Sequence, residues 1–252
     1  MSAADLGIGL AGGIDKDGSR AAELLAAGFA SIEFGSVAAG IAGYPDAGAA
    51  VLAERLGALA ALADERPRPA PSPRIGVGVS RPPGAPSAAL ADCWLAALEA
   101  LAGVADYVSF NLSAAANRPL LAAEQRPLLA RSFATVAAWR DVSAAAGGRR
   151  LDLAVKLPLG ALGELLPSAA LLAAAAGFDQ LTVVRADDDA GFSRLTALDR
   201  HLHGGLPLVV VGGIRSAADV GAARAAGAAG VQVHRLFVEQ GVRCVETLCP
   251  SA

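Results

Sequence analysis

Lysine is almost absent from this chain of 252 residues, which has nineteen arginines but only two lysines, Lys16 and Lys156. Each lysine stands where a short apolar run typical of a β-strand gives way to a loop, in LGIGLAGGIDKDG and LDLAVKLPLG. Arginine is a fixed cation, whereas lysine is a compact and adaptable point charge, so two lysines at strand ends favour a specific polar contact. The alternative interpretation is two ordinary solvated lysines.

Other scarce features exclude whole classes of function. The three cysteines form no CxxC pair and there are only three histidines, which argues against a metal site. A net charge of −3 without a basic cluster argues against nucleic-acid binding. The longest uncharged apolar stretch, residues 169–178, is too short to span a bilayer, and the start of the chain does not resemble a signal peptide. We therefore expect a soluble, cytoplasmic protein that acts on a small molecule, with neither membrane nor nucleic acid as partner.

Short apolar runs alternate along the chain with alanine-rich segments. The runs predict strands near 6–10, 31–36, 74–79, 106–111, 151–157, 180–185, 207–212 and 229–234. The segments between them predict helices near 18–28, 47–63, 87–102, 120–146, 161–176, 192–203, 216–226 and 236–247. Eight such units in this length predict an α/β fold, a (β/α)8 TIM barrel spanning residues 1–252 as one domain. An open doubly wound sheet is the alternative. A proline-rich segment, residues 64–74, is predicted as a loop on the N-terminal face.

Period-two alternation predicts which strand residues point into the barrel. They are Gly76 and Gly78 of the third strand, Tyr107, Ser109 and Asn111 of the fourth, Asp152, Ala154 and Lys156 of the fifth, and Gln232 and His234 of the eighth. The two glycines should leave room for a flat group above them. The result is a polar, roomy mouth at the C-terminal end of the barrel.

A glycine pair near the end of the chain predicts a phosphate site. Gly212 and Gly213 follow an apolar strand and open a helix, so backbone N–H groups and the helix N-terminus can face an anion. Phosphate-binding barrels place such a group at the loops after strands seven and eight. His234 and Arg235 stand at the end of the eighth strand, and arginine suits a bidentate phosphate contact. A plain turn is the alternative.

In order along the chain, six segments resemble motifs of the dihydroorotate dehydrogenase family, enzymes that carry flavin mononucleotide (FMN) on a (β/α)8 barrel. They are LAGGIDKDG at 10–18, GFASIEFGSV at 28–37, DYVSFNLS at 106–113, AVKL at 154–157, and VGGIRS with GAAGVQVH at 211–216 and 227–234. The resemblance implies FMN as cofactor, with Lys16, Asn111 and Lys156 as catalytic residues. It implies a cofactor site formed by Gly12, Lys16, Ser36, Asn111, Lys156, Gly212, Gly213, His234 and Arg235. Lys156 would stabilise negative charge on the reduced flavin, and a homodimer is expected by analogy with the family.

The chain also departs from the family's pattern where the substrate would react. The position of the catalytic base, a serine or cysteine in the family, is Ala114, which cannot accept a proton. The loop 40–46 keeps Tyr44 but lacks the asparagines that read a pyrimidine, and Arg185 stands where the family has asparagine. Because unmatched buried polar groups reject a ligand, the enzyme should not accept dihydroorotate. We expect Tyr44, Asn117 and Arg185 to bind the substrate instead.

Three functions remain open on these residues. The first is a divergent FMN-dependent oxidoreductase for an unidentified small molecule, with Arg185 facing an anionic group or else paired with one of Asp187, Asp188 and Asp189. Lys16, Tyr44, His234 or water would then handle the proton. The second is a lyase or isomerase without redox chemistry, whose phosphorylated substrate uses the glycine pair. The third is a non-catalytic partner subunit.

Overall fold

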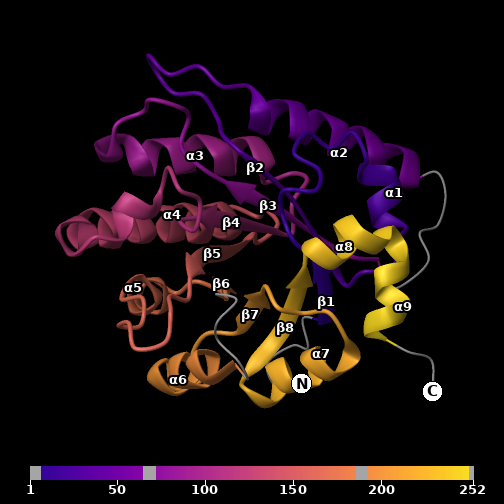
Figure 1. The fold of residues 1–252 in the computed structure, drawn as a ribbon. Helices are drawn as coiled ribbons and strands as arrows, with labels where there is room; N and C mark the ends of the chain where they lie inside the picture. Colours follow the sequence, from indigo (N-terminus) through magenta and orange to yellow (C-terminus); the bar gives the residue numbers. More distant parts are fainter. Residues whose placement is uncertain (1–6, 65–71, 186–191, 250–252) are drawn as a thin grey trace.

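Parallel strands form a closed barrel at the centre of the protein (Figure 1). The computed structural model describes residues 7–64, 72–185 and 192–249. Within these ranges the strands are β1 (Gly7–Leu10), β2 (Ser31–Val37), β3 (Arg74–Val79), β4 (Tyr107–Asn111), β5 (Asp152–Pro158), β6 (Gln180–Val184), β7 (Leu208–Val211) and β8 (Ala228–Val233). Each pairs with its neighbour in chain order, and β1 pairs with β8. The predicted barrel is confirmed, and each strand ends within one residue of its prediction.

Helices surround the barrel (Figure 1). They are α1 (Ala21–Leu25), α2 (Gly48–Asp64), α3 (Leu90–Leu101), α4 (Arg126–Ala145), α5 (Ala169–Ala175), α6 (Ser193–His201), α7 (Ala217–Ala225), α8 (Arg235–Gln240) and α9 (Cys244–Leu248). The helix predicted over 161–176 is wrong in its first half, where Gly160 and Gly163 adopt φ of +79° and +85°. The single helix predicted over 236–247 is also wrong. It is split between α8 and α9, because Gly241 has φ +61°.

An aromatic cluster packs β4 against the helices outside it. Phe110 of β4 lies 4.5 Å, centroid to centroid, from Trp94 of α3. Trp94 stacks on Phe133 of α4 at 5.8 Å, and Phe133 meets Phe178 edge to face at 4.8 Å. Buried aromatic rings contribute large apolar areas and prefer these offset and tilted geometries. Phe110 thus points outward, as the alternation along the strand predicts.

The side chains predicted to face inward do meet across the barrel. Nε2 of Gln232 on β8 donates to the Tyr107 hydroxyl of β4 over 3.3 Å, and both side chains are buried. Gly76 of β3 makes room for that ring, because a Cβ at Gly76 would lie 2.0 Å from Cζ of Tyr107. The flat group above Gly76 is therefore a residue of the chain itself and not a ligand.

Two predictions fall wholly or partly outside the described residues. The proline-rich loop predicted over 64–74 is described only at its two ends, since 65–71 lie outside the described ranges, as do Asp187, Asp188 and Asp189. In the described parts of the chain, no helix combines the length and the apolar character needed to cross a bilayer.

Candidate functional site

The Lys156 ammonium lies inside the barrel near the C-terminal end of β5. Its Nζ donates a 3.0 Å hydrogen bond to Oε1 of Glu33 on β2, and both side chains are buried. Oε2 of the same carboxylate accepts a 3.2 Å hydrogen bond from Nε2 of Gln232. A buried ion pair is tolerated when hydrogen bonds also satisfy its remaining atoms. An ammonium carries three donors, so Lys156 has two left for a group above the barrel.

Sequence reasoning gave Glu33 no role, although this residue holds Lys156 in place. It lies between Ile32 and Phe34, both fully buried hydrophobic residues. In a strand, this alternation turns the carboxylate to the opposite face from the two apolar side chains. The alternation in the sequence could have revealed Glu33, because a carboxylate on the inward face of a strand needs a buried cation as partner.

Asn111, at the end of β4, is held by hydrogen bonds within the chain. Its Oδ1 accepts from the Ser113 backbone N–H at 3.1 Å, the Ser113 hydroxyl at 2.7 Å and the Ala114 N–H at 3.2 Å. Its Nδ2 donates to Oγ of Ser36 on β2 over 2.8 Å. The carbonyl oxygen is thus occupied by the turn that follows β4. One amide N–H is left to meet a ligand.

Lys16 is exposed on the loop after β1. Asp15 shapes this loop, because its Oδ1 accepts from the Gly18 N–H at 2.8 Å and its Oδ2 from the Arg20 N–H at 2.9 Å. The Asp15 carbonyl also accepts from the Gly35 N–H of β2 at 2.9 Å. No partner for the Lys16 ammonium occurs within residues 7–64, 72–185 and 192–249. The loop therefore presents a charge that a ligand can use.

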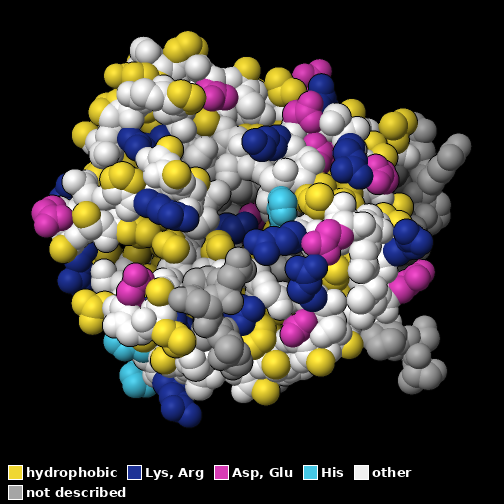
Figure 2. All heavy atoms as spheres, in the orientation of Figure 1, with side chains coloured by type: hydrophobic (Ala, Val, Ile, Leu, Met, Phe, Trp, Pro, Cys, Tyr) yellow, Lys and Arg dark blue, Asp and Glu magenta, His cyan; other side chains and the backbone are white. Residues whose placement is uncertain are grey.

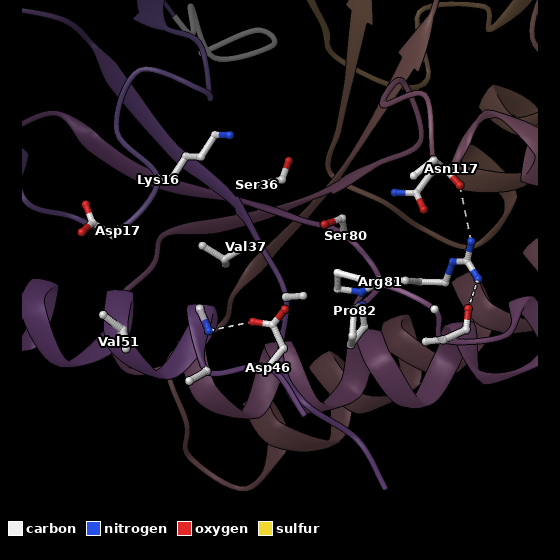
Figure 3. Close-up of a pocket in the computed structure, with 17 residues that line it drawn as sticks. Lys16, Asp17, Ser36, Val37, Asp46, Val51, Ser80, Arg81, Pro82 and Asn117 are labelled. Carbon is white, nitrogen blue, oxygen red and sulfur yellow. Dashed lines mark hydrogen bonds between the residues drawn. The ribbon is translucent and has the colours of Figure 1, made fainter. Parts of the chain in front are cut away.

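A cavity of about 630 Å³ opens beside Lys16 at the C-terminal ends of β1 to β4 (Figure 3). We call it the side cavity. Figure 3 shows Lys16 and Ser36 on one side of it and Arg81 and Asn117 on the other. Its polar lining comes from Lys16, Asp17, Ser36, Asp46, Ser80, Arg81 and Asn117. The volume suits a small organic ligand.

The two carboxylates of the side cavity are occupied by neighbours. Oδ1 of Asp46 accepts from the Gly48 N–H at 2.8 Å, at the start of α2. Asp17 pairs with Arg55, and hydrogen bonds from Ser19 and Arg55 hold the pKa of Asp17 far below its ordinary value. A carboxylate so acidic is a weak base. Asp17 is therefore not suited to accept a proton from a substrate.

Arg81 was missed by the sequence analysis. Its guanidinium donates to the Ala85 carbonyl at 2.5 Å and to the Ala116 carbonyl at 3.4 Å (Figure 3). It thus joins the loop after β3 to the loop after β4, and no carboxylate pairs with it among the described residues. The sequence gives one indication that Arg81 lies near the site, namely its position two residues after the apolar strand β3.

The residues predicted to bind substrate do not lie together. Asn117 lines the side cavity, where its Nδ2 donates to the Asn111 carbonyl over 2.8 Å. Tyr44 does not line it, but lies 3.8 Å from the position that a Cβ would take at Gly84, in the cavity wall. Arg185 lies elsewhere, at the glycine pair. Their roles in substrate binding stay predictions.

The two lysines occupy one end of the barrel but different surroundings. Lys16 lines the side cavity with Ser36, which bonds Asn111, and Asn111 pairs in register with Lys156. Lys156 itself is not part of the cavity lining. The Ser36–Asn111 hydrogen bond thus stands between the two cations. That both lysines hold one flavin ring stays a prediction.

The glycine pair follows β7 with the left-handed φ angles that only glycine adopts easily, +100° at Gly212 and +71° at Gly213. By register, β6 and β8 flank β7, so Arg185 and the His234–Arg235 pair end up on either side of the glycines. Lys and Arg side chains gather around the hollow in the middle of the face shown in Figure 2. The arrangement can hold an anion through backbone N–H groups and arginines.

His234 faces the loop after β1. Its Nε2 lies 3.4 Å from the position that a Cβ would take at Gly13. Partial desolvation, followed by the positive charges of Lys156 and Arg235, lowers the pKa of His234 from its ordinary 6.5. The ring is therefore neutral at neutral pH and can donate and accept hydrogen bonds. No cluster of metal-ligating side chains is present in the described residues.

Comparison with known proteins agrees with the resemblance seen in the sequence. No family model matches the chain. The chain is 30% identical to the dihydroorotate dehydrogenase (quinone) of Synechococcus sp. (strain JA-3-3Ab), over 96% of its own length and 73% of that protein. It is 27% identical to the dihydroorotate dehydrogenase (quinone) of Flavobacterium lutescens, over 96% of its own length and 80% of that protein.

A solved structure shares the fold. The crystal structure of dihydroorotate dehydrogenase from Eimeria tenella in complex with ferulenol superposes with a TM-score of 0.75 and 17% sequence identity. The match covers 96% of this chain and 78% of that chain. With the barrel, the motif order and these relatives together, the chain belongs to the dihydroorotate dehydrogenase family.

Proposed function

We propose that this protein is an FMN-dependent oxidoreductase acting on a small anionic molecule other than dihydroorotate. The observation that carries the proposal is the set of donors at the C-terminal end of the barrel. A buried ammonium with two available protons lies at its centre, and a glycine pair flanked by arginines lies at its edge. A flavin mononucleotide needs both, a cation near its ring and an anion site for its phosphate.

The residues present fit this cofactor. Lys156, one N–H of Asn111 and the Ser36 hydroxyl would meet the ring, while the N–H groups at Gly212 and Gly213 with Arg235 would meet the phosphate. Gly12 has no side chain, and a Cβ there would lie 2.9 Å from Oε1 of Glu33. When bound, FMN would supply the two-electron exchange with the substrate. The protein would supply position and charge.

The side cavity is the proposed substrate site. Lys16 and Arg81 give it two cations that no carboxylate pairs with among the described residues, which supports an anionic substrate. It contains one asparagine, Asn117, and Gly78, which stands where the family carries an inward asparagine on β3, is not part of its lining. A ring that presents several amide groups would leave them unmatched in this lining, at about 1–3 kcal/mol for each buried group. Dihydroorotate is such a ring.

Lys16 is the side chain of this cavity that is placed to bind the substrate's anionic group. Ala114 offers no acid or base, and neither Tyr44 nor His234 lines the side cavity. Asp17 pairs with Arg55, and Oδ1 of Asp46 accepts a hydrogen bond from the Gly48 N–H. Lys16 is exposed to the cavity and pairs with nothing else in the described ranges. Its ammonium would stay protonated and bind the anionic group, and a proton that the substrate loses would pass to water.

The first test is an absorption spectrum of the freshly purified protein. A flavin spectrum, with FMN identified by mass after release, supports the proposal. Anaerobic bleaching of that spectrum is then measured with dihydroorotate and with a panel of small 2-hydroxy and saturated carboxylates, which can give two electrons to the flavin. Rapid bleaching by dihydroorotate contradicts the proposed substrate class. A colourless protein that binds a phosphorylated metabolite would favour the lyase or isomerase function instead.

A matched pair of variants tests the cavity. Lys16→Gln should slow bleaching by an active carboxylate roughly tenfold to hundredfold, as expected for loss of a charge-assisted contact to the substrate. Arg131→Gln removes an exposed cation on the outer helix α4 and should leave the rate unchanged. Equal bleaching rates in the two variants would show that Lys16 takes no part in the reaction.

A further inference from the structure

The Glu33 carboxylate lies near the C-terminal end of the barrel and is bordered there by glycine. A Cβ at Gly12 would lie 2.9 Å from its Oε1, and a Cβ at Gly78 would lie 3.5 Å from the same atom. The loop after β1 and strand β3 thus leave only backbone beside this oxygen. The Glu33 side chain is 2% exposed, so water screens its charge little. A negative charge in this place acts on any ligand that Lys156 binds.

Two donors fix the carboxylate, one for each oxygen. Nζ of Lys156 donates to Oε1 over 3.0 Å, and Nε2 of Gln232 donates to Oε2 over 3.2 Å. The same Nε2 donates to the Tyr107 hydroxyl over 3.3 Å, whereas Oε1 of Gln232 has no hydrogen-bond partner in the described part of the chain. If the amide were turned around, its oxygen would face the carboxylate and repel it. Gln232 is therefore held in one orientation, and it holds Glu33 in turn.

Glu33 and Lys156 are the two charged members of this hydrogen-bonded chain. Burial, followed by the negative charge of Glu33, raises the pKa of Tyr107 well above its ordinary value. The phenol therefore stays protonated at neutral pH, and the amide of Gln232 carries no charge. Because the ammonium and the carboxylate are 3.0 Å apart, their fields oppose one another at a ligand farther away.

We propose that Glu33 opposes the charge of Lys156 and so sets how strongly the site prefers reduced over oxidised FMN, with Gln232 positioning the carboxylate. The inference rests on the proposed function. Lys156 alone would favour the negatively charged ring of reduced FMN. The carboxylate behind it weakens that preference, so reduced FMN gives up its electrons more readily. Glu33 acts through Lys156 and is a positioning residue, not a catalytic one.

The experiment measures the midpoint potential of FMN bound to the protein. Absorbance is followed while dithionite reduces the loaded protein stepwise without oxygen, beside a dye of known potential. Glu33→Gln removes the charge and keeps an amide of similar size. It should raise the affinity for reduced FMN relative to oxidised FMN roughly tenfold to hundredfold, or about 30–60 mV for a two-electron couple. Glu33→Asp keeps the charge one methylene farther from Nζ and should shift the ratio in the same direction by less.

Tyr107→Phe is the matched control, since it breaks a hydrogen bond of the same chain without removing a charge. It should lower the melting temperature and leave the ratio of the two affinities unchanged. Circular dichroism melting of each variant without flavin checks folding. An unchanged ratio in Glu33→Gln, or an equal shift in Tyr107→Phe, overturns the inference. If Glu33→Gln does not fold, an unchanged ratio in Glu33→Asp overturns it as well.

His234 gives a second measurement that needs no flavin. Partial desolvation, followed by the positive charge of Lys156, lowers the pKa of His234. In flavin-free Glu33→Gln the charge of Lys156 is unopposed, so NMR titration should find the pKa of His234 lower than in the wild type. Tyr107→Phe should leave it where it is. An unchanged pKa of His234 in a folded Glu33→Gln variant counts against opposed charges. Wild-type protein that binds no FMN overturns the proposed function, whereas a lowered pKa of His234 still supports the opposition of the two charges.

Discussion

Replacing Lys156 by methionine should destabilise the barrel strongly. The change keeps most of the side-chain volume but leaves the Glu33 carboxylate without its cation, with 2% of that side chain exposed. Removing one partner of a buried ion pair costs about 3–5 kcal/mol, because the remaining charge stays in a low-dielectric interior. For a domain of this size, each kcal/mol corresponds to about 2–4 °C in Tm, so Lys156→Met should melt roughly 6–20 °C below the wild type.

The assay is urea unfolding followed by circular dichroism at neutral pH, with thermal melting alongside. Lys16→Met is the matched control, because it removes the other lysine of the chain, which is exposed. It should change stability by less than about 0.5 kcal/mol. Both variants replace a lysine by methionine, so the difference between their stabilities measures the effect of burying Lys156.

A double-mutant cycle tests the reason for the loss. Glu33→Gln removes the buried negative charge and keeps an acceptor for Gln232, so Lys156→Met should cost less in this background. The coupling between the two changes should be about 1–3 kcal/mol. If Lys156→Met melts like Lys16→Met, or if the two changes are additive, Lys156 does not form the buried pair described here.

Three further predictions follow from single contacts. Gly76→Ala should lower the free energy of unfolding by about 1–3 kcal/mol, because it forces a Cβ into the Tyr107 ring. Gly103→Ala has open space around it and should not lower it, and urea unfolding compares the two variants. Because the folded state lowers the pKa of His234, the unfolded chain takes up more protons, so wild type should lose stability relative to His234→Gln as pH falls through 6.5. An unchanged difference across that pH would contradict this. Ala114→Ser should still not let dihydroorotate bleach the flavin; bleaching would show that only the base is missing.

The strands were predictable because each is a short apolar run bounded by glycine, proline or charge, and parallel pairing in chain order follows from the alternation with helices. The ends of the helices were not predictable in the same way. Alanine favours helix almost everywhere, and the prediction over 161–176 gave too little weight to Gly163 and Pro167, which precede the start of α5. Its actual start, Ala169, follows Pro167 and a segment that contains two glycines with left-handed φ angles.

Which side chains point inward was also predictable, but not which partner each would meet. Alternation placed Lys156 and Gln232 inside, while the carboxylate that joins them, Glu33, comes from a strand more than a hundred residues earlier. Arg185 shows the same limit. Its position after β6 indicated the mouth of the barrel, yet the neighbour that decides its direction is the missing side chain of Gly213. Contacts between distant segments are set by tertiary packing, which a single sequence does not encode locally.

The position of Glu33 has a consequence for synthesis of the chain on the ribosome. The carboxylate emerges early, but its cation follows 123 residues later and its amide partner 199 residues later. A nascent chain that ends before Lys156 would have to bury an uncompensated charge, so its first strands should stay solvated until β5 has left the exit tunnel. A product truncated before β5 cannot neutralise its own interior, so burial of the inner face requires at least the first five strands.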